Sequence, residues 1–197
     1  MALVSVAFAK DGKVRVERLR DAPIITPNTH PSIGGNIQGP SLIRVPDWVA
    51  NRLGRYYLYF ADHKGQYIRL AFADDLRGPW RVHPPGSLQI EDSHFPSEPP
   101  PNPPGELEKL QARRAASGRS RSKLPHSLAK EATAPHIASP DVHVDKENRQ
   151  IVMYFHGLEG VSRQVTRVAT SHDGIHFEAR PEVLGRTYMR VFPYDGY

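Results

Sequence analysis

The sequence predicts an all-β fold built from repeated four-stranded antiparallel sheets. Three observations support this prediction: short alternating runs rich in Val, Ile, Tyr and Phe, polar turns such as DHKG, DKEN and HDG between them, and one order of segments that occurs twice. A chain of 197 residues with 39% apolar and 24% charged side chains has the composition of a globular domain.

The two copies of the repeat lie on either side of a central insert. The first reads GPSLIRV, RYYLYFADH, YIRLAFADDLRGPW and RVH, and the second reads SPDVHVD, RQIVMYFHG, QVTRVATSHDGIHF and EARPEVLG. The expected counterparts are Tyr59-Phe60 with Tyr154-Phe155, Ala73 with Ala169, Asp75 with Asp173, and Trp80 with Phe177. A third copy is expected to begin with YMRVFPYDGY.

Four-stranded sheets repeated around an axis form a β-propeller. We therefore predict a single incomplete propeller domain over residues 1–197, with two blades and the first strands of a third. Because two copies do not close a ring, the chain is either a fragment of a longer protein, a partner of other chains, or an open two-sheet body. A two-sheet sandwich made from the same strands is the alternative fold.

Residues 97–133 form a Pro/Arg/Ser-rich insert, which we expect to be largely disordered, with a short helix possible over Glu106–Ala116. The insert holds seven Lys or Arg against four Glu, in a chain whose formal net charge is +5. No aromatic residue lies among these basic residues to stack on bases, so a solvated charged segment is expected rather than a nucleic-acid partner.

The remaining composition limits the chemistry. Without cysteine the chain has no disulfide or thiolate metal site, and no histidine spacing indicates a metal, so neither metal nor cofactor is expected. The first residues lack a basic region ahead of a short apolar run, so a strand is predicted there rather than a signal peptide. No run approaches the roughly 18 apolar residues of a membrane span. We expect no membrane association and favour a cytoplasmic protein.

The segment ASPDVHVDKENRQIVMYFHG resembles the second-blade signature of five-bladed β-propeller glycosidases, the glycoside hydrolase family 43 group and its relatives. The segment YYLYFADHKGQYIRLAFADDLRGPW resembles their first-blade hairpin. The resemblance implies a carbohydrate-active protein that cleaves glycosidic bonds in oligo- or polysaccharides. It also implies three carboxylates around a central channel: an Asp base, a second Asp that orients and tunes, and a Glu acid.

One of these three carboxylates has a match in this sequence. Asp141 matches the second-blade Asp, with a strand-start residue bonded to its own turn as the alternative. The first-blade Asp precedes the proline of its strand, where this chain has Gly39, and the third-blade Glu would lie near Thr187 or Tyr188. A sugar-binding or interaction propeller without catalytic acids, and an inactive truncated product, are therefore the alternative functions.

Five residues are candidates for substrate binding: Gln38, Asp62, His63, His136 and Arg190. Asp62 and His63 end the second strand of the first copy, where His63 could donate a proton near neutral pH or bind a sugar hydroxyl, and Asp62 could equally be a turn residue. His136 and His156 are expected near the same channel mouth. Arg69 and Arg190, inside apolar strands, need a partner, either Asp141 or a carboxylate-bearing sugar.

Overall fold

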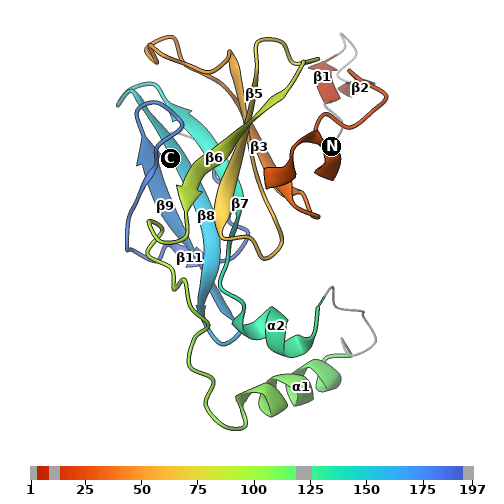
Figure 1. Cartoon of the computed structure of the whole chain (residues 1–197), viewed down its shortest axis with the longest axis vertical. Coiled ribbons are helices and arrows are strands. Elements are labelled where there is room, and N and C mark those ends of the chain that lie inside the picture. The colour runs from red at the N-terminus through yellow and green to blue at the C-terminus, as the bar shows by residue number, and fades with distance from the viewer. Residues whose placement is uncertain (1–3, 9–13, 119–125, 193–197) are drawn as a thin grey trace.

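The computed structural model describes residues 4–8, 14–118 and 126–192, and most of its strands belong to two antiparallel sheets (Figure 1). The first sheet contains β3 (Gln38–Arg44), β4 (Tyr56–Ala61), β5 (Tyr67–Ala73) and β6 (Arg81–Gln89), in chain order. The second contains β7 (Ile137–Asp145), β8 (Gln150–Gly160), β9 (Arg163–Ser171) and β10 (Glu178–Ala179), and β11 (Gly185–Arg186) also pairs with β9.

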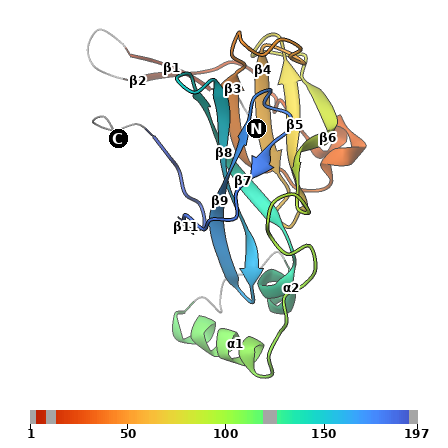
Figure 2. The ribbon, with the colours of Figure 1, turned by 90° about the vertical axis from the view of Figure 1, so that its left-hand side faces the viewer.

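The remaining elements lie outside these sheets. They are the hairpin strands β1 (Val4–Phe8) and β2 (Val14–Arg18), the short 3-10 helices η1 (Pro27–Thr29) and η2 (Pro31–Ile33), and the helices α1 (Glu106–Ala116) and α2 (Leu128–Thr133). The β1–β2 hairpin extends to one side of the sheets, and α1 and α2 lie together beyond one end of them (Figure 2). No helix in the described ranges is long and apolar enough to cross a bilayer.

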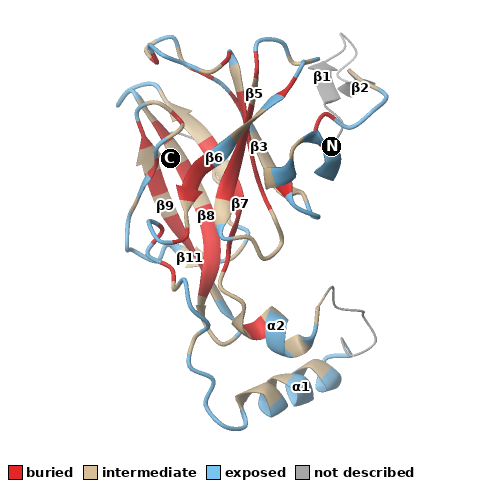
Figure 3. Cartoon of the chain, viewed as in Figure 1, coloured by how far each residue is buried: buried red, intermediate tan, exposed pale blue. Residues whose placement is uncertain are grey.

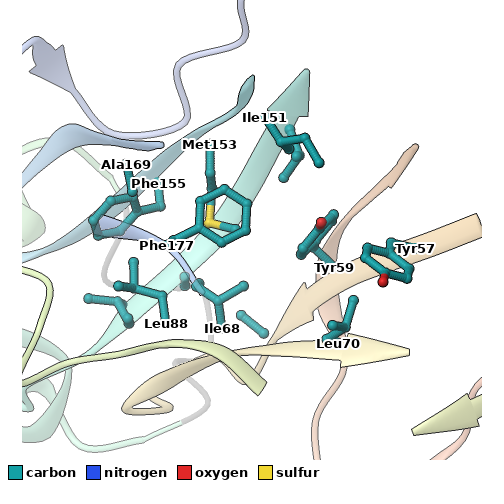
Figure 4. Packing of buried hydrophobic residues seen from close by; sticks show 14 of the residues in the cluster. Tyr57, Tyr59, Ile68, Leu70, Leu88, Ile151, Met153, Phe155, Ala169 and Phe177 are labelled. Carbon is teal, nitrogen blue, oxygen red and sulfur yellow. The ribbon is translucent and has the colours of Figure 1, made fainter. Parts of the chain in front are cut away.

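The core lies where the two sheets face each other, and the buried residues follow the strands rather than the helices (Figure 3). Met153, Phe155 and Phe177 face Ile68 and Leu88 of the first sheet across this interface (Figure 4). Burial of such side chains is the main favourable term in folding. The interface is therefore what holds the two sheets together.

The first sheet is covered on both faces. On the face away from the second sheet, Leu58 and Phe60 pack with Ile24, Ile25 and Ile33 from the segment before β3. Tyr59, on the other face, donates a hydrogen bond from its hydroxyl to Gly174 O at 2.7 Å. This double coverage explains why YYLYFA is a continuous apolar run rather than an alternating one.

The strand ladders confirm the internal repeat. Ser41 pairs with Tyr59 in the first sheet, and Asp141 pairs with Tyr154 in the second. In both inner strands the register shifts just before the paired residue, after Gln38 and after Ala138. The residue inside each bulge has a positive φ, 59° at Gly39 and 53° at Ser139. Two strands with the same bulge at the same position are copies of one unit.

One expected correspondence between the copies was wrong. Ala169 pairs with Met153, the residue before Tyr154, and its counterpart is Ala71, which pairs with Leu58, the residue before Tyr59. Ala73 instead corresponds to Ser171, two residues further along. The hairpin from Tyr59 to its partner Leu70 is three residues shorter than the one from Tyr154 to its partner Val168, and this difference leaves the register of β5 unspecified by the apolar pattern.

The fold class is all-β, as predicted, with two antiparallel sheets and few helices arranged as an incomplete, propeller-like fold. The inner strands β3 and β7 lie against each other, because Val142 N donates to Ser41 Oγ at 2.9 Å across the two sheets. Neighbouring blades of a propeller approach each other in this way, inner strand against inner strand.

The described parts of the insert carry two helices, and the one over Glu106–Ala116 has the bounds of the helix that the sequence allows. Residues 119–125, which the expectation of disorder also covers, lie outside the described residues. Acidic residues in the first turn of α1 and basic residues in its last turn complement the helix dipole. Ser127 caps α2 by accepting a hydrogen bond from Lys130 N, and Ala132 is buried. Good helix formers and a side-chain cap thus order these parts of the insert.

Candidate functional site

A cavity of about 920 Å³ lies where β3 and β7 begin and β4 and β8 end. Its lining includes three residues that the sequence predicted, Gln38, His63 and His136, together with His156, which was expected at the same mouth. Further lining residues come from α2, β9 and the segment that follows β11. Both sheets and the insert therefore contribute to one cavity.

His63 is held at both ring nitrogens. The side-chain amide of Gln38 lies 3.1 Å from Nδ1, and Oε2 of Glu131 lies 3.2 Å from Nε2. Because the amide nitrogen can only donate, Nδ1 accepts and Nε2 carries the proton that is donated to Glu131. His63 therefore positions Glu131 and offers no free nitrogen to a ligand in this arrangement.

Glu131 reaches the cavity from α2 and contacts two residues of the first sheet. Its Oε2 lies 3.4 Å from Lys64 Nζ as well as close to His63, while Oε1 is buried without a hydrogen-bond partner in the described ranges. Burial alone would raise the pKa of Glu131, but the hydrogen bond from His63 and the charge of Lys64 outweigh it and lower that pKa. The carboxylate is therefore ionised at neutral pH.

For Lys64, the effect of burial on the pKa outweighs the effect of the ion pair. Its side chain is only 6% exposed, and this burial lowers its pKa even though Glu131 acts to raise it. Besides the carboxylate, the ammonium donates to the backbone oxygen of Glu131 at 3.2 Å. The two groups anchor α2 to the loop after β4, and the insert closes one side of the cavity.

His136 and His156 are a pair of buried, neutral imidazoles in the cavity wall. Their ring centroids lie 6.1 Å apart. Nδ1 of His136 donates to Ala134 O at 2.8 Å, which leaves Nε2 as the lone-pair nitrogen. Burial lowers the pKa of His136 to about 4, and burial together with nearby cationic groups lowers the pKa of His156 to about 3.

Tyr188 completes this wall. Its ring centroid lies 4.7 Å from that of His156, and the residue is 62% exposed. Together, His136, His156 and Tyr188 can donate and accept hydrogen bonds and offer an aromatic face. These properties suit a ligand with several hydroxyl groups. Within the described residues, no group of three or more His, Asp or Glu is arranged to hold a metal ion.

Asp141 lies outside the lining of this cavity. Its Oδ2 accepts hydrogen bonds from Val191 N at 2.8 Å and from His143 Nε2 at 3.0 Å. Arg190 Nη1 lies 4.0 Å from Oδ1 and donates to the backbone oxygens of Ser139 and Pro140. The contacts of Asp141 and Arg190 are thus with each other, with the His143 side chain and with neighbouring backbone.

The contact between Asp141 and Val191 repeats a contact of the first copy. There the Ser41 hydroxyl accepts from Val142 N, and here the Asp141 carboxylate accepts from Val191 N. Tyr188 has a φ of 59°, like Gly39 and Ser139, so the segment that ends with Val191 begins a third copy. The side chain two residues after each bulge therefore ties β3 to β7, and β7 to the segment around Val191.

This equivalence agrees with the alignment of GPSLIRV with SPDVHVD. The position before the proline is Gly39 in the first copy and Ser139 in the second, and Asp141, two residues later, corresponds to Ser41. The expected base position at Gly39 and the position of Asp141 are therefore two different places in the repeat.

Asp62 and Arg69 pair with each other. The Arg69 guanidinium, which is buried, donates to Asn36 O at 2.9 Å and to Asp62 Oδ2 at 3.3 Å. The partner of Arg69 is therefore Asp62 and not Asp141. Asp62 borders a neighbouring cavity of about 560 Å³ that shares His63 and Lys64 with the first.

Sequence reasoning missed Lys64 and Glu131. Glu131 lies 68 residues from His63 in the chain, inside the segment expected to be disordered. The one local signal was the Ser127 cap ahead of LAKEAT, which predicts a helix but not the side chain that its glutamate meets.

Comparisons with known proteins leave the function open. No protein-family model matches the sequence. An uncharacterized protein of Acanthamoeba polyphaga mimivirus is 34% identical over 172 residues, which covers 82% of this chain and 40% of that protein. The endo-1,5-α-L-arabinanase of Thermotoga petrophila RKU-1 is similar at 17% identity with a TM-score of 0.40, over 92% of this chain and 43% of that one. This chain thus spans about two fifths of the length of either protein.

Proposed function

We propose that the chain is part of a carbohydrate-active, propeller-like protein and that the cavity beside β3 and β7 binds a saccharide. The observation that carries this proposal is the convergence of two neutral imidazoles and an exposed tyrosine ring in one cavity of about 920 Å³. Ligand sites are commonly such concave places with a few converging polar groups.

A neutral imidazole can accept a hydrogen bond from a sugar hydroxyl, whereas a protonated one cannot. A hydroxyl group both donates and accepts, and the Nε2 lone pair of His136 accepts from it as long as the ring is unprotonated. With pKa values of about 4 and about 3, His136 and His156 stay neutral throughout the neutral range. Tyr188 supplies a ring on which the apolar face of a pyranose stacks.

Hydrolysis of a glycosidic bond is the second candidate. It is favoured by Glu131, the carboxylate among the described lining residues of the cavity, which is ionised and therefore suited to a base or an orienting role. An inverting reaction also needs a protonated acid about 6.5–9.5 Å away. The two bulge positions, Gly39 and Ser139, and the corresponding Tyr188 carry no carboxylate, so none supplies that acid. Asp141 is proposed as an orienting residue that would act from outside the cavity lining.

The test is calorimetric titration of the purified chain at pH 7 with a panel of neutral and acidic oligosaccharides, combined with an assay for new reducing ends. We expect saturable binding that weakens about tenfold or more in His136→Ala, which removes one buried hydrogen-bonding group. His172→Ala, whose side chain lies outside this cavity, is the matched control. Binding without product indicates a sugar-binding module, and product release indicates a hydrolase. Failure of every sugar to bind would contradict the proposal.

A further inference from the structure

We infer that the saccharide bound in this cavity is acidic and carries a carboxylate or a sulfate. This inference rests on the proposed function, since it specifies the ligand of the same site. Its starting point is the charge of the lining: Lys64, Arg163 and Arg186 are the cationic side chains that carry the inference, and Glu131 is the one carboxylate among the described lining residues.

Both carboxylates that contact Lys64 and Arg163 are already engaged. Glu131 is taken up by Lys64 and His63. Glu159, which lies outside the lining, is shared by two guanidinium groups, Arg163 at 3.2 Å and the buried Arg167 at 3.0 Å. One negative charge therefore serves two positive ones on this side of the cavity.

Arg186 is the cation that a ligand would meet most directly. It lies on β11, its side chain is exposed, and it has no ion pair within the described ranges. Its backbone oxygen accepts a hydrogen bond from Thr166 Oγ1 at 2.6 Å, which fixes the strand while the guanidinium stays available. A planar guanidinium with several donors binds a carboxylate or a sulfate through paired, charge-assisted hydrogen bonds.

The two buried histidines respond to the same positive field. After burial, the causes that lower the pKa of His156 are His136, Lys64, Arg190 and His63. Lys64 and His63 also lower the pKa of His136, whereas its hydrogen bond to Ala134 and the charge of Glu131 raise it. Nδ1 of His156 is buried and has no hydrogen-bond partner in the described ranges. An anionic ligand group would offset this field and accept hydrogen bonds, whereas a neutral sugar would leave the surplus charge without a partner.

The experiment compares trigalacturonate with its methyl ester, which keeps the sugar framework and removes the charge. Binding is measured by calorimetry at pH 7, in about 0.05 M and about 0.5 M NaCl. We expect the free acid to bind at least about tenfold more tightly than the ester at low salt, with the difference shrinking at high salt. A sulfated disaccharide of carrageenan distinguishes a sulfate from a carboxylate as the preferred group.

Two variants test whether Arg186 causes the preference for the acidic sugar. Arg186→Gln is expected to lower the affinity for trigalacturonate about tenfold and to leave that for the ester unchanged. Arg44→Gln, which removes an exposed arginine of β3 outside the cavity, is the matched control and should change neither affinity. Unfolding curves confirm that both variants stay folded.

The outcomes separate the two proposals. If the ester binds as tightly as the free acid, or if Arg186→Gln and Arg44→Gln behave alike, the cavity binds sugars without selecting acidic ones, and this inference is overturned. If no oligosaccharide binds at all, the proposed function fails with it. Binding of an oligothymidylate as tightly as trigalacturonate would also overturn the inference, because the cavity would then select polyanions in general.

Discussion

Gly39 shows why the bulge of the first inner strand carries no carboxylate side chain. Its φ is 59°, in the region that favours glycine, and a Cβ built at this position would lie 2.6 Å from Ser139 Cα. The contact is with backbone of the neighbouring copy, which has little room to move. An aspartate at residue 39 would therefore be excluded by the packing of β3 against β7.

Replacing Gly39 with alanine is expected to destabilise the protein by about 1–3 kcal/mol, from the strained φ and the clash together. Gly35→Ala is the control, because no atom lies within 4 Å of a Cβ built there, and it should change stability by less than about 0.5 kcal/mol. Urea unfolding measures both. Equal stability of the two variants would show that β3 and β7 are not closely packed at Gly39.

The buried histidines predict how stability depends on pH. The unfolded-state pKa of histidine is about 6.5, and burial lowers that of His136 to about 4 and that of His156 to about 3. The unfolded chain therefore binds more protons below about pH 6.5, so the stability is fully present above pH 7 and falls as the pH falls. We expect a loss of about 2 kcal/mol per histidine between about pH 7 and pH 5.

The variant His156→Gln isolates one of these contributions. Its stability should fall less steeply from about pH 7 to pH 5 than that of the parent chain, whatever its stability at pH 7. Asp173, whose hydrogen bonds hold its pKa at about 2, contributes only below about pH 4 and so does not overlap with this window. Parallel profiles for the parent and the variant would refute the assigned cause.

At the scale of elements, α2 is anchored by the ion pair between Glu131 and Lys64. Their side chains are 14% and 6% exposed, so the attraction is screened less than that of a surface pair. A double-mutant cycle with Lys64→Met and Glu131→Gln is expected to give a coupling of about 1–2 kcal/mol in urea unfolding.

The pair between Lys109 and Glu106 on α1 provides the control for this cycle. Its side chains are 65% and 41% exposed, and its coupling should not exceed about 0.5 kcal/mol. Similar couplings for the two pairs would mean that Glu131 does not anchor α2 to the sheet, and the insert would then not form a fixed wall of the cavity.

Asp141 ties β7 to the segment around Val191, and we expect this role to need an acceptor rather than a charge. Asp141→Ala should speed amide hydrogen exchange at Val191 by about tenfold or more, whereas Asp141→Asn, which keeps an oxygen in place, should change it little. Ser41→Ala should have the corresponding effect on Val142. If Asn and Ala speed the exchange of Val191 equally, the charge of Asp141 is what matters.

At the scale of the whole molecule, the repeated sheets could be predicted because their signals are local. Alternating apolar residues and Gly- or Asp-containing turns mark the strands, and the same order of segments in both halves marks the repeat. The bulges could not be predicted, since an extra residue with positive φ at Ser139 leaves no mark on the apolar pattern. The alignment of GPSLIRV with SPDVHVD nevertheless placed Asp141 opposite Ser41, as the strand ladders do.

The site was less predictable because its contacts connect distant parts of the chain. His63 and His136 were predicted as candidates from their positions at strand ends, and the fold brings them with Gln38 to one mouth. Glu131 was not predicted, because its segment is poor in large apolar residues and such a composition predicts disorder. In the structure this segment is held by the contacts of Glu131 with His63 and Lys64. Long-range ion pairs of this kind have no signature in a single sequence.

The most direct test of the central claim, that the cavity between the repeated sheets binds a saccharide, is nuclear magnetic resonance of isotope-labelled histidine rings during titration with trigalacturonate. The ring signals of His136 and His156 should shift and saturate together, while those of His172 and His176, which border a separate cavity, should not move. Unshifted signals from His136 and His156 at saturating sugar, or shifts confined to His172 and His176, would contradict the claim.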